Sequence, residues 1–156
     1  MASDTFTFDT TSPTITVNDI ADLVNSLSST GGTAADAMPG QLSRVEIQIR
    51  NAGRNTCWDG SRWVSASAWM AASGTDSWNC TLPPLDDGSV YEVRARAVDE
   101  AGNESTVASE TFTFDTTAPT VTVTDIANLV NSLSSIGGTA ADAPPGQLDR
   151  VEAQLR

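Results

Sequence analysis

The chain has 156 residues and a formal net charge of −12 at pH 7, with 14 Asp and six Glu against eight Arg and with no lysine or histidine. Arginines scattered among more numerous carboxylates argue against nucleic acid as a partner, and the short apolar runs argue against insertion into a membrane. Without histidine and with only two cysteines, the chain lacks the usual general base and a structural zinc site, so we expect no enzyme.

Strands are expected first at 14–17, 28–35 and 44–50, where Val, Ile and Thr alternate with polar residues. In 44–50, Val45, Ile47 and Ile49 face one way and the polar residues between them face the other. Between the first two strands, 18–27 has apolar residues at three-to-four-residue spacing, which predicts one short helical turn.

The next segment, 56–64, has Asp59-Gly60 between aromatic residues, which is a strong local signal for a β-hairpin. Further strands are expected at 77–82, 90–98 and 111–114. Tyr91 at the start of 90–98 fits a tyrosine corner, in which the phenol binds nearby backbone. About seven short strands with this spacing predict an all-β immunoglobulin-like sandwich with a Greek key.

The sequence also repeats itself, because residues 5–50 return as residues 111–156 with nine differences in 46 positions. An offset of 106 residues is the length of a whole domain and exceeds that of a solenoid unit. We therefore expect tandem modules. The interpretation assigns 1–8 to the last strand of a preceding module, 9–114 to a complete module (module one) and 115–156 to a partial second module (the second copy), holding the first three strands.

Several motifs resemble those of tandem bacterial Ig-like repeats from large surface adhesins and biofilm-associated proteins. They are D-T-T-[SA]-P-T-[IV]-T-V at 9–17 and 115–123, G-G-T-A-A-D at 31–36, C-W-D-G-S-R-W at 57–63, L-D-D-G-S-V-Y at 85–91 and A-V-D-E-A-G-N at 97–103. The resemblance implies a non-catalytic spacer at the bacterial cell surface that extends a distal binding domain. It also implies neighbouring repeats as partners.

Four tryptophans lie within one 21-residue stretch, which leaves open a carbohydrate-binding module or an accessory module of a secreted hydrolase, because indole rings stack on sugars. The structural alternative is that Trp58 and Trp63 stack across the hairpin while Trp69 and Trp78 close the core. The two interpretations differ in whether the indoles are exposed.

Cys57 and Cys80 each adjoin a tryptophan on a predicted strand. We expect a cross-strand disulfide between them, which an oxidising extracellular environment permits. The alternative is two small buried thiols.

Acidic loops indicate a candidate calcium site. In the predicted topology Asp9, Asp36, Asp99 and Asn103 gather at the amino-terminal pole of module one, and Asp115 and Asp142 are their counterparts in the second copy. Carboxylates that converge from separate loops repel one another unless a hard cation lies among them. The alternative is that Asp is simply a favoured turn residue.

The second copy leaves an apolar face without the strands that would cover it. Since Thr5–Phe8 repeats the last strand of module one, strand-swapped self-association through the second copy is a further prediction.

Overall fold

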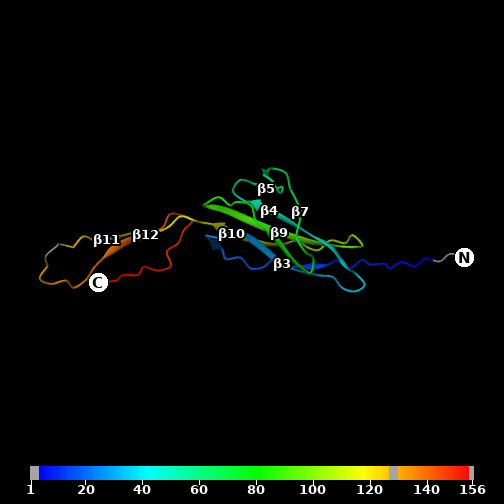
Figure 1. Cartoon of the computed structure of the whole chain (residues 1–156), viewed down its shortest axis with the longest axis horizontal. Coiled ribbons are helices and arrows are strands. Elements are labelled where there is room, and N and C mark those ends of the chain that lie inside the picture. Colours follow the sequence, from blue (N-terminus) through cyan, green and yellow to red (C-terminus); the bar gives the residue numbers. More distant parts are fainter. Residues whose placement is uncertain (1–3, 127–129, 155–156) are drawn as a thin grey trace.

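The computed structural model describes residues 4–126 and 130–154, and these contain strands but no helix. The predicted all-β class is confirmed. The molecule is elongated, with module one between the N-terminal segment at one end and the second copy at the other (Figure 1).

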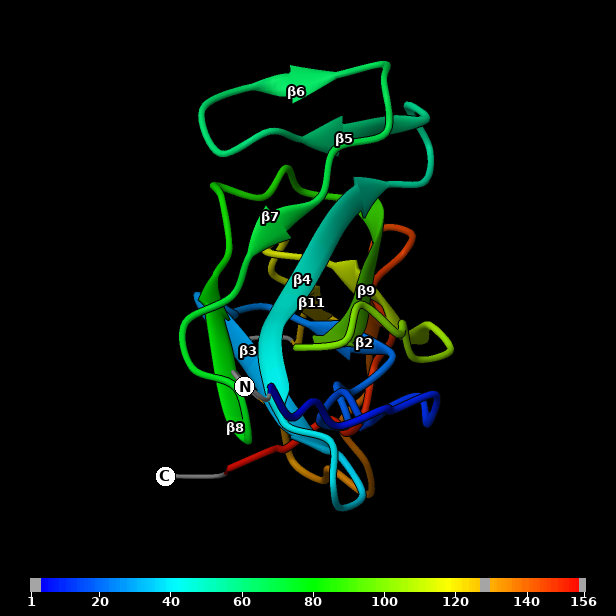
Figure 2. The same ribbon diagram turned by 90° about the vertical axis from the view of Figure 1, so that its right-hand side faces the viewer.

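A three-stranded sheet forms one layer of module one. It consists of β1 (Thr14–Ile15), β3 (Ser29–Ala35) and β8 (Ser77–Thr81), in the order β1-β3-β8 with antiparallel neighbours. These strands fall within the predicted segments 14–17, 28–35 and 77–82. In Figure 2, β3 and β8 run side by side.

A seven-stranded sheet forms the other layer. Its order is β2-β10-β9-β4-β5-β6, with β7 paired to β4 on the side. The strands are β2 (Leu23–Val24), β4 (Leu42–Asn51), β5 (Thr56–Trp58), β6 (Trp63–Val64), β7 (Met70–Ala71), β9 (Ser89–Asp99) and β10 (Ala108–Phe114). The long central pair β4–β9 holds the sheet together, because its antiparallel register runs from Leu42↔Asp99 to Asn51↔Tyr91.

The core lies between the two sheets, as in a β-sandwich. It takes Ala34, Trp78 and Cys80 from the smaller sheet and alternate residues of β4, β9 and β10 from the larger one. The alternation predicted for 44–50 and 90–98 is confirmed, since Val45, Ile47 and Ile49 on β4 and Tyr91, Val93, Ala95 and Ala97 on β9 are all buried. Burial of this apolar area is the main stabilising contribution.

The short helical turn predicted at 18–27 is wrong. The segment instead contains β2, which pairs in parallel with β10 in the register Thr113↔Leu23 and Phe114↔Val24. The backbone amides of Thr113 and Asp115 donate to the carbonyls of Asp22 and Val24 at 2.8 and 2.9 Å. The apolar spacing therefore serves to pack Ile20, Val24 and Leu27 against the core.

The two local motifs of the middle segment are confirmed. β5 and β6 form the hairpin, with Trp58 opposite Trp63 and their ring centroids 5.6 Å apart in an edge-to-face arrangement. The Tyr91 hydroxyl accepts a hydrogen bond of 2.8 Å from the backbone amide of Asp86, five residues upstream. This bond ties the turn before β9 to the core.

The second copy forms β11 (Thr120–Val123) and β12 (Gly138–Ala141), an antiparallel pair. Their register, Thr120↔Ala141, repeats Thr14↔Ala35 of module one with the 106-residue offset. The third strand predicted there, the counterpart of 44–50, falls at 150–156; residues 150–154 form no strand, and 155–156 lie outside the described residues. Among the described residues of the second copy, only β11 and β12 pair with each other.

Residues 4–8 are not part of a strand, and Phe6 and Phe8 are exposed. Residues 1–3 of the predicted terminal strand lie outside the described residues. The assignment of 1–8 to a preceding module therefore stays a prediction.

Candidate metal centre

Three carboxylates predicted to meet at the amino-terminal pole of module one do meet. Asp9, Asp36 and Asp99 each offer an oxygen, and these oxygens all lie within 4.8 Å of one another. Asp9 precedes β1, Asp36 follows β3, and Asp99 is the last residue of β9. The cluster therefore joins both sheets to the segment that enters the module.

Two oxygens of this cluster have no protein partner. Asp9 uses Oδ1 to accept the amide of Thr11, and Asp36 uses Oδ1 to accept the amide of Ala37, each at 2.9 Å. The Oδ2 atoms of Asp9 and Asp36 are buried and accept no hydrogen bond. A buried carboxylate oxygen without a donor is costly, so these atoms point to a ligand that supplies positive charge.

Asp99 is 2 % exposed and is held by Asn103. The backbone amide and the side-chain amide of Asn103 donate to Oδ1 and Oδ2 of Asp99, both at 2.7 Å. Burial acts to raise the pKa of Asp99, but the hydrogen bonds from Asn103, together with those from the backbone amides of Gly102 and Ala101, outweigh it and the pKa lies below its ordinary value. Asp99 is therefore an anion at neutral pH.

Asn103 holds two members of the cluster together. Its side-chain amide also donates to the backbone carbonyl of Asp9 at 3.3 Å. The contacts made by its nitrogen position Asn103 between Asp9 and Asp99, and its role as a metal ligand stays a prediction.

Gly40 makes room for the carboxylates, and the sequence analysis did not identify it. A Cβ atom at this position would overlap the Oδ2 atoms of both Asp36 and Asp9. The same holds in the second copy, where a Cβ at Gly146 would overlap the carboxylate of Asp142. The signal was present in the sequence, because Pro-Gly follows the Asp at the same spacing in both copies.

The donor set fits a hard divalent cation. Ca²⁺ takes six to eight oxygen ligands, usually from carboxylates, carbonyls and water, and tolerates irregular geometry. Asp9, Asp36 and Asp99 supply three carboxylates and no nitrogen or sulfur ligand. An ion here would stabilise the negative charges against one another and link the chain entry at Asp9 to β3 and β9.

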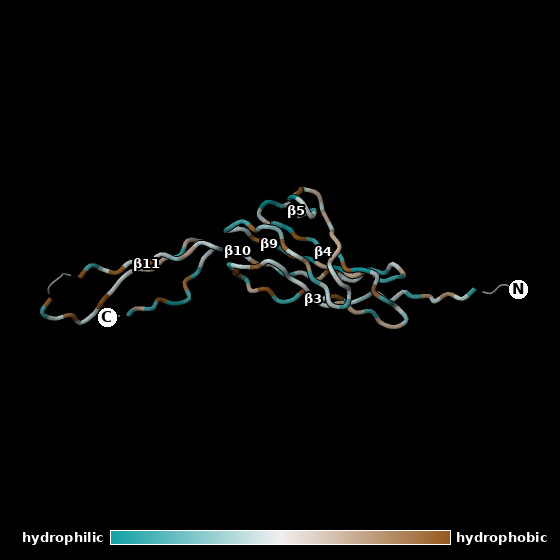
Figure 3. The backbone as a smooth tube through the Cα atoms, viewed as in Figure 1, coloured by the Kyte–Doolittle hydropathy of each residue, from teal (hydrophilic) through white to brown (hydrophobic). Residues whose placement is uncertain are grey.

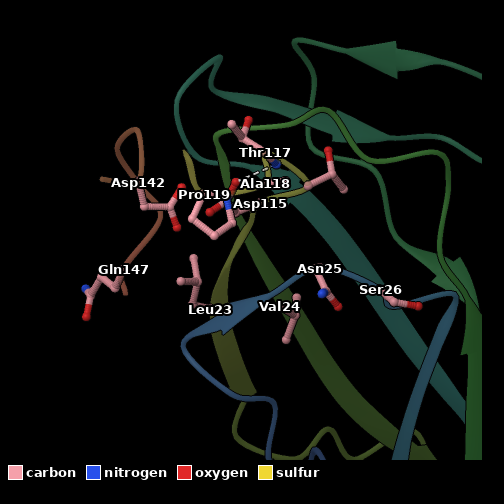
Figure 4. A pocket seen from close by; sticks show the side chains of 11 residues that line it. Leu23, Val24, Asn25, Ser26, Asp115, Thr117, Ala118, Pro119, Asp142 and Gln147 are labelled. Carbon is pink, nitrogen blue, oxygen red and sulfur yellow. Dashed lines mark hydrogen bonds between the residues drawn. The ribbon is translucent and has the colours of Figure 1, made fainter. Parts of the chain in front are cut away.

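The two counterparts in the second copy line one cleft at the junction between the copies. Asp115 and Asp142 line a cleft of about 590 Å³ together with Leu23–Ser26 of module one (Figure 4). Asp115 is buried and accepts the amide of Thr117 at 3.0 Å, as Asp9 accepts that of Thr11, and Oδ1 of Asp142 is buried without a partner. Among the described residues, no third carboxylate joins this pair.

The predicted disulfide is not formed, and Cys57 and Cys80 are buried free thiols. Cys57 lies on β5 of the larger sheet and Cys80 on β8 of the smaller one, so they are not on paired strands. Burial raises the pKa of the Cys80 thiol. The alternative of two buried thiols describes this structure.

The tryptophans do not form an exposed platform. Trp78 is fully buried in the core, as predicted, and Trp58 and Trp63 are half-buried against each other. Trp69 does not close the core; the guanidinium of Arg96 lies 4.7 Å from its ring centroid on the outer face of β9. This arrangement is structural and gives no support to a sugar-stacking site.

Within the described residues, no helix is long and apolar enough to cross a membrane. No protein-family model matches the chain, and no curated protein matches it either.

Proposed function

We propose that the chain is a non-catalytic, Ig-like spacer from a tandem array on a bacterial surface protein. The observation that carries the proposal is the 106-residue repeat, whose two copies have the same pairing register in β1–β3 and β11–β12. An array of such units gains length by repetition and needs no active site.

The strand order supports an Ig-like topology. The smaller sheet joins β1, β3 and β8, whereas β10, the last strand of module one, lies between β9 and the short β2. The parallel β2–β10 pair brings an early segment and the end of the module together, so a pull on the two termini loads the backbone hydrogen bonds from Thr113 and Asp115 to Asp22 and Val24. This arrangement suits a module whose task is mechanical.

The acidic pole adds a role for calcium. Bound Ca²⁺ would connect Asp9, in the segment entering the module, to Asp36 and Asp99 in its body. Ligand binding to the folded state stabilises it by about 1.4–2.7 kcal/mol when the ion is present at roughly 10 to 100 times its dissociation constant. The proposal is therefore a spacer that calcium stiffens, outside the cell where calcium is plentiful.

Single-molecule pulling on the whole chain tests this function. Unfolding of module one should release a contour length of about 350–380 Å, because 106 residues extend to about 3.3–3.6 Å each. The unfolding force should rise on changing from chelator to millimolar calcium, and Asp36→Asn should remove most of that rise.

Asp76→Asn is the matched control, since Asp76 is an exposed Asp outside the cluster. A module that unfolds at forces indistinguishable from baseline contradicts the spacer role. A calcium response equal in wild type and Asp36→Asn contradicts the metal site alone.

A further inference from the structure

One carboxylate of module one, that of Asp87, binds the linker to the second copy at Thr116 and Thr117. Asp87 lies in the turn before β9, and its Oδ1 accepts the backbone amide of Thr116 at 2.5 Å and the hydroxyl of Thr116 at 2.9 Å. Its Oδ2 accepts the hydroxyl of Thr117 at 2.8 Å. Two consecutive linker residues therefore place three donors on a single side chain.

Further contacts on both sides of the linker reinforce the binding of Thr116 and Thr117 by Asp87. The amide of Gly88 donates to the carbonyl of Phe114 at 2.8 Å, and the amide of Asp115 donates to the carbonyl of Val24 at 2.9 Å. Gly88 also approaches the loop of the second copy, because a Cβ there would lie 3.9 Å from Cδ of Pro145. The turn, the linker and the next copy thus meet at one place.

The chemistry explains why the contact is strong at neutral pH. The backbone amide of Thr116, and then the two threonine hydroxyls, lower the pKa of Asp87 below its ordinary value. A charged acceptor forms shorter and stronger hydrogen bonds than a neutral one. The partner segment recurs, since Thr10 and Thr11 hold the same places at the start of module one.

We propose that Asp87 is a positioning residue that fixes the direction of the next module, by docking its Asp-Thr-Thr segment on the turn before β9. The end of one module that contains the turn before β9 is then the docking surface for the first residues of the following copy. This docking surface uses no metal ion, so it stands apart from the calcium part of the proposed function. It also sets the place of Asp115, which adjoins Thr116 and lines the junction cleft.

The neighbouring Asp86 provides a matched control. It has the same charge in the same turn, but its carboxylate binds Arg54 of module one at 2.7 Å. Replacing Asp86 therefore removes one charge from this pole without removing a linker contact.

Residual dipolar couplings of the ¹⁵N-labelled whole chain, measured in chelator, test the inference. In the wild type, the couplings of β9–β10 and β11–β12 should fit one alignment tensor. In Asp87→Ala those of β11–β12 should fall at least twofold, and the Thr116 amide should exchange with solvent at least tenfold faster. Asp86→Ala should retain the wild-type pattern.

A second variant guards against loss of folding in Asp87→Ala. Thr116→Val with Thr117→Val removes the two hydroxyl donors from the linker side, leaves module one untouched and should weaken the common alignment as well. The inference is overturned if the wild-type copies do not share a tensor, if Asp87→Ala and the double valine variant both retain it, or if Asp86→Ala loses it equally. Because no calcium is present, absence of a calcium effect elsewhere does not alter the result.

Discussion

Module one and the second copy start from nearly the same sequence and reach different structures. Both form the first antiparallel pair, and in both a threonine pair crosses it, with Thr16 and Thr33 hydroxyls at 2.9 Å and Thr122 and Thr139 hydroxyls at 2.6 Å. Only module one continues into β4. Val45 on β4 is 1 % exposed, whereas its counterpart Val151 is 62 % exposed.

The difference shows which strands form from local sequence alone and which need a partner far along the chain. Register of the first pair needs only the segments that form it, together with the turn residues between them. β4 needs β9, and the paired residues of the two strands lie between 40 positions (Asn51↔Tyr91) and 57 positions (Leu42↔Asp99) apart in the chain. In the second copy a similar alternating pattern, with Ala153 in place of Ile47, forms no strand at 150–154. An open apolar groove of about 820 Å³ is lined there by Val121, Val123, Ile126 and Val151, and brown hydrophobic stretches recur along this region in Figure 3.

That exposed face keeps strand-swapped self-association as a prediction. Thr5–Phe8 and the second copy would have to meet between chains, and both carry exposed apolar residues, with Phe6 90 % exposed.

The largest expected effect on stability comes from replacing Phe112, which has an equivalent in Phe6. Phe112 is 1 % exposed in the core and stacks on Tyr91, so Phe112→Ala should reduce the free energy of unfolding by about 3–5 kcal/mol. Phe6→Ala changes the same residue in the same TFTF context and should leave stability unchanged. Urea denaturation followed by tryptophan fluorescence measures both. Equal losses would mean that Thr5–Phe8 is also packed in solution.

An intermediate effect is expected at the acidic pole. Gly40→Ala places a methyl group against the Oδ2 atoms of Asp9 and Asp36, so it should remove the rise in melting temperature on adding calcium and cost about 1–3 kcal/mol through overpacking. Calorimetry with calcium and with chelator measures this.

Gly53→Ala is the control for that change, since the nearest atom to a Cβ there is Oδ1 of Asn51 at 3.6 Å. A Gly40→Ala chain with the full calcium response would show that the ion does not lie among these carboxylates.

The sequence was informative wherever a residue's role depends on its own strand or turn. The alternation in 44–50 and 90–98, the Asp59-Gly60 hairpin and the Tyr91 corner were all predictable, and so was the gathering of Asp9, Asp36 and Asp99, because the topology brings their loops to one pole.

Errors arose where the outcome depends on a distant partner. The apolar spacing of 18–27 fits a helix as well as it fits a segment that pairs with β10. The tryptophans next to Cys57 and Cys80 do not reveal that the two thiols belong to different sheets. The hydrogen bonds between Asp87 and Thr116 could not be predicted from the local sequence either, because the two residues are 29 positions apart.

The smallest expected effect concerns Glu46 and its counterpart in the second copy, Glu152. Glu46 accepts hydrogen bonds from Arg44 at 2.8 Å and from Arg96 at 2.7 Å, whereas its counterpart Glu152 meets Arg150 on an exposed segment. The Arg44 hydrogen bond foremost, against desolvation and with help from Arg96, lowers the pKa of Glu46 below its ordinary value.

Glu46→Gln should therefore destabilise module one by at most about 1 kcal/mol, and Glu152→Gln should have no measurable effect. Because the folded pKa of Glu46 is lowered, its contribution is complete above the ordinary Glu pKa of about 4.3 and is lost as the pH falls through the folded value. The difference in stability between wild type and Glu46→Gln, measured by urea denaturation at pH 7 and again near pH 3, should shrink at the lower pH. A difference that stays constant between the two pH values would show that Glu46 stabilises the module through packing of its side chain and not through its charge. The ion pair with Arg96 would then not explain why Glu46 contributes more to stability than Glu152.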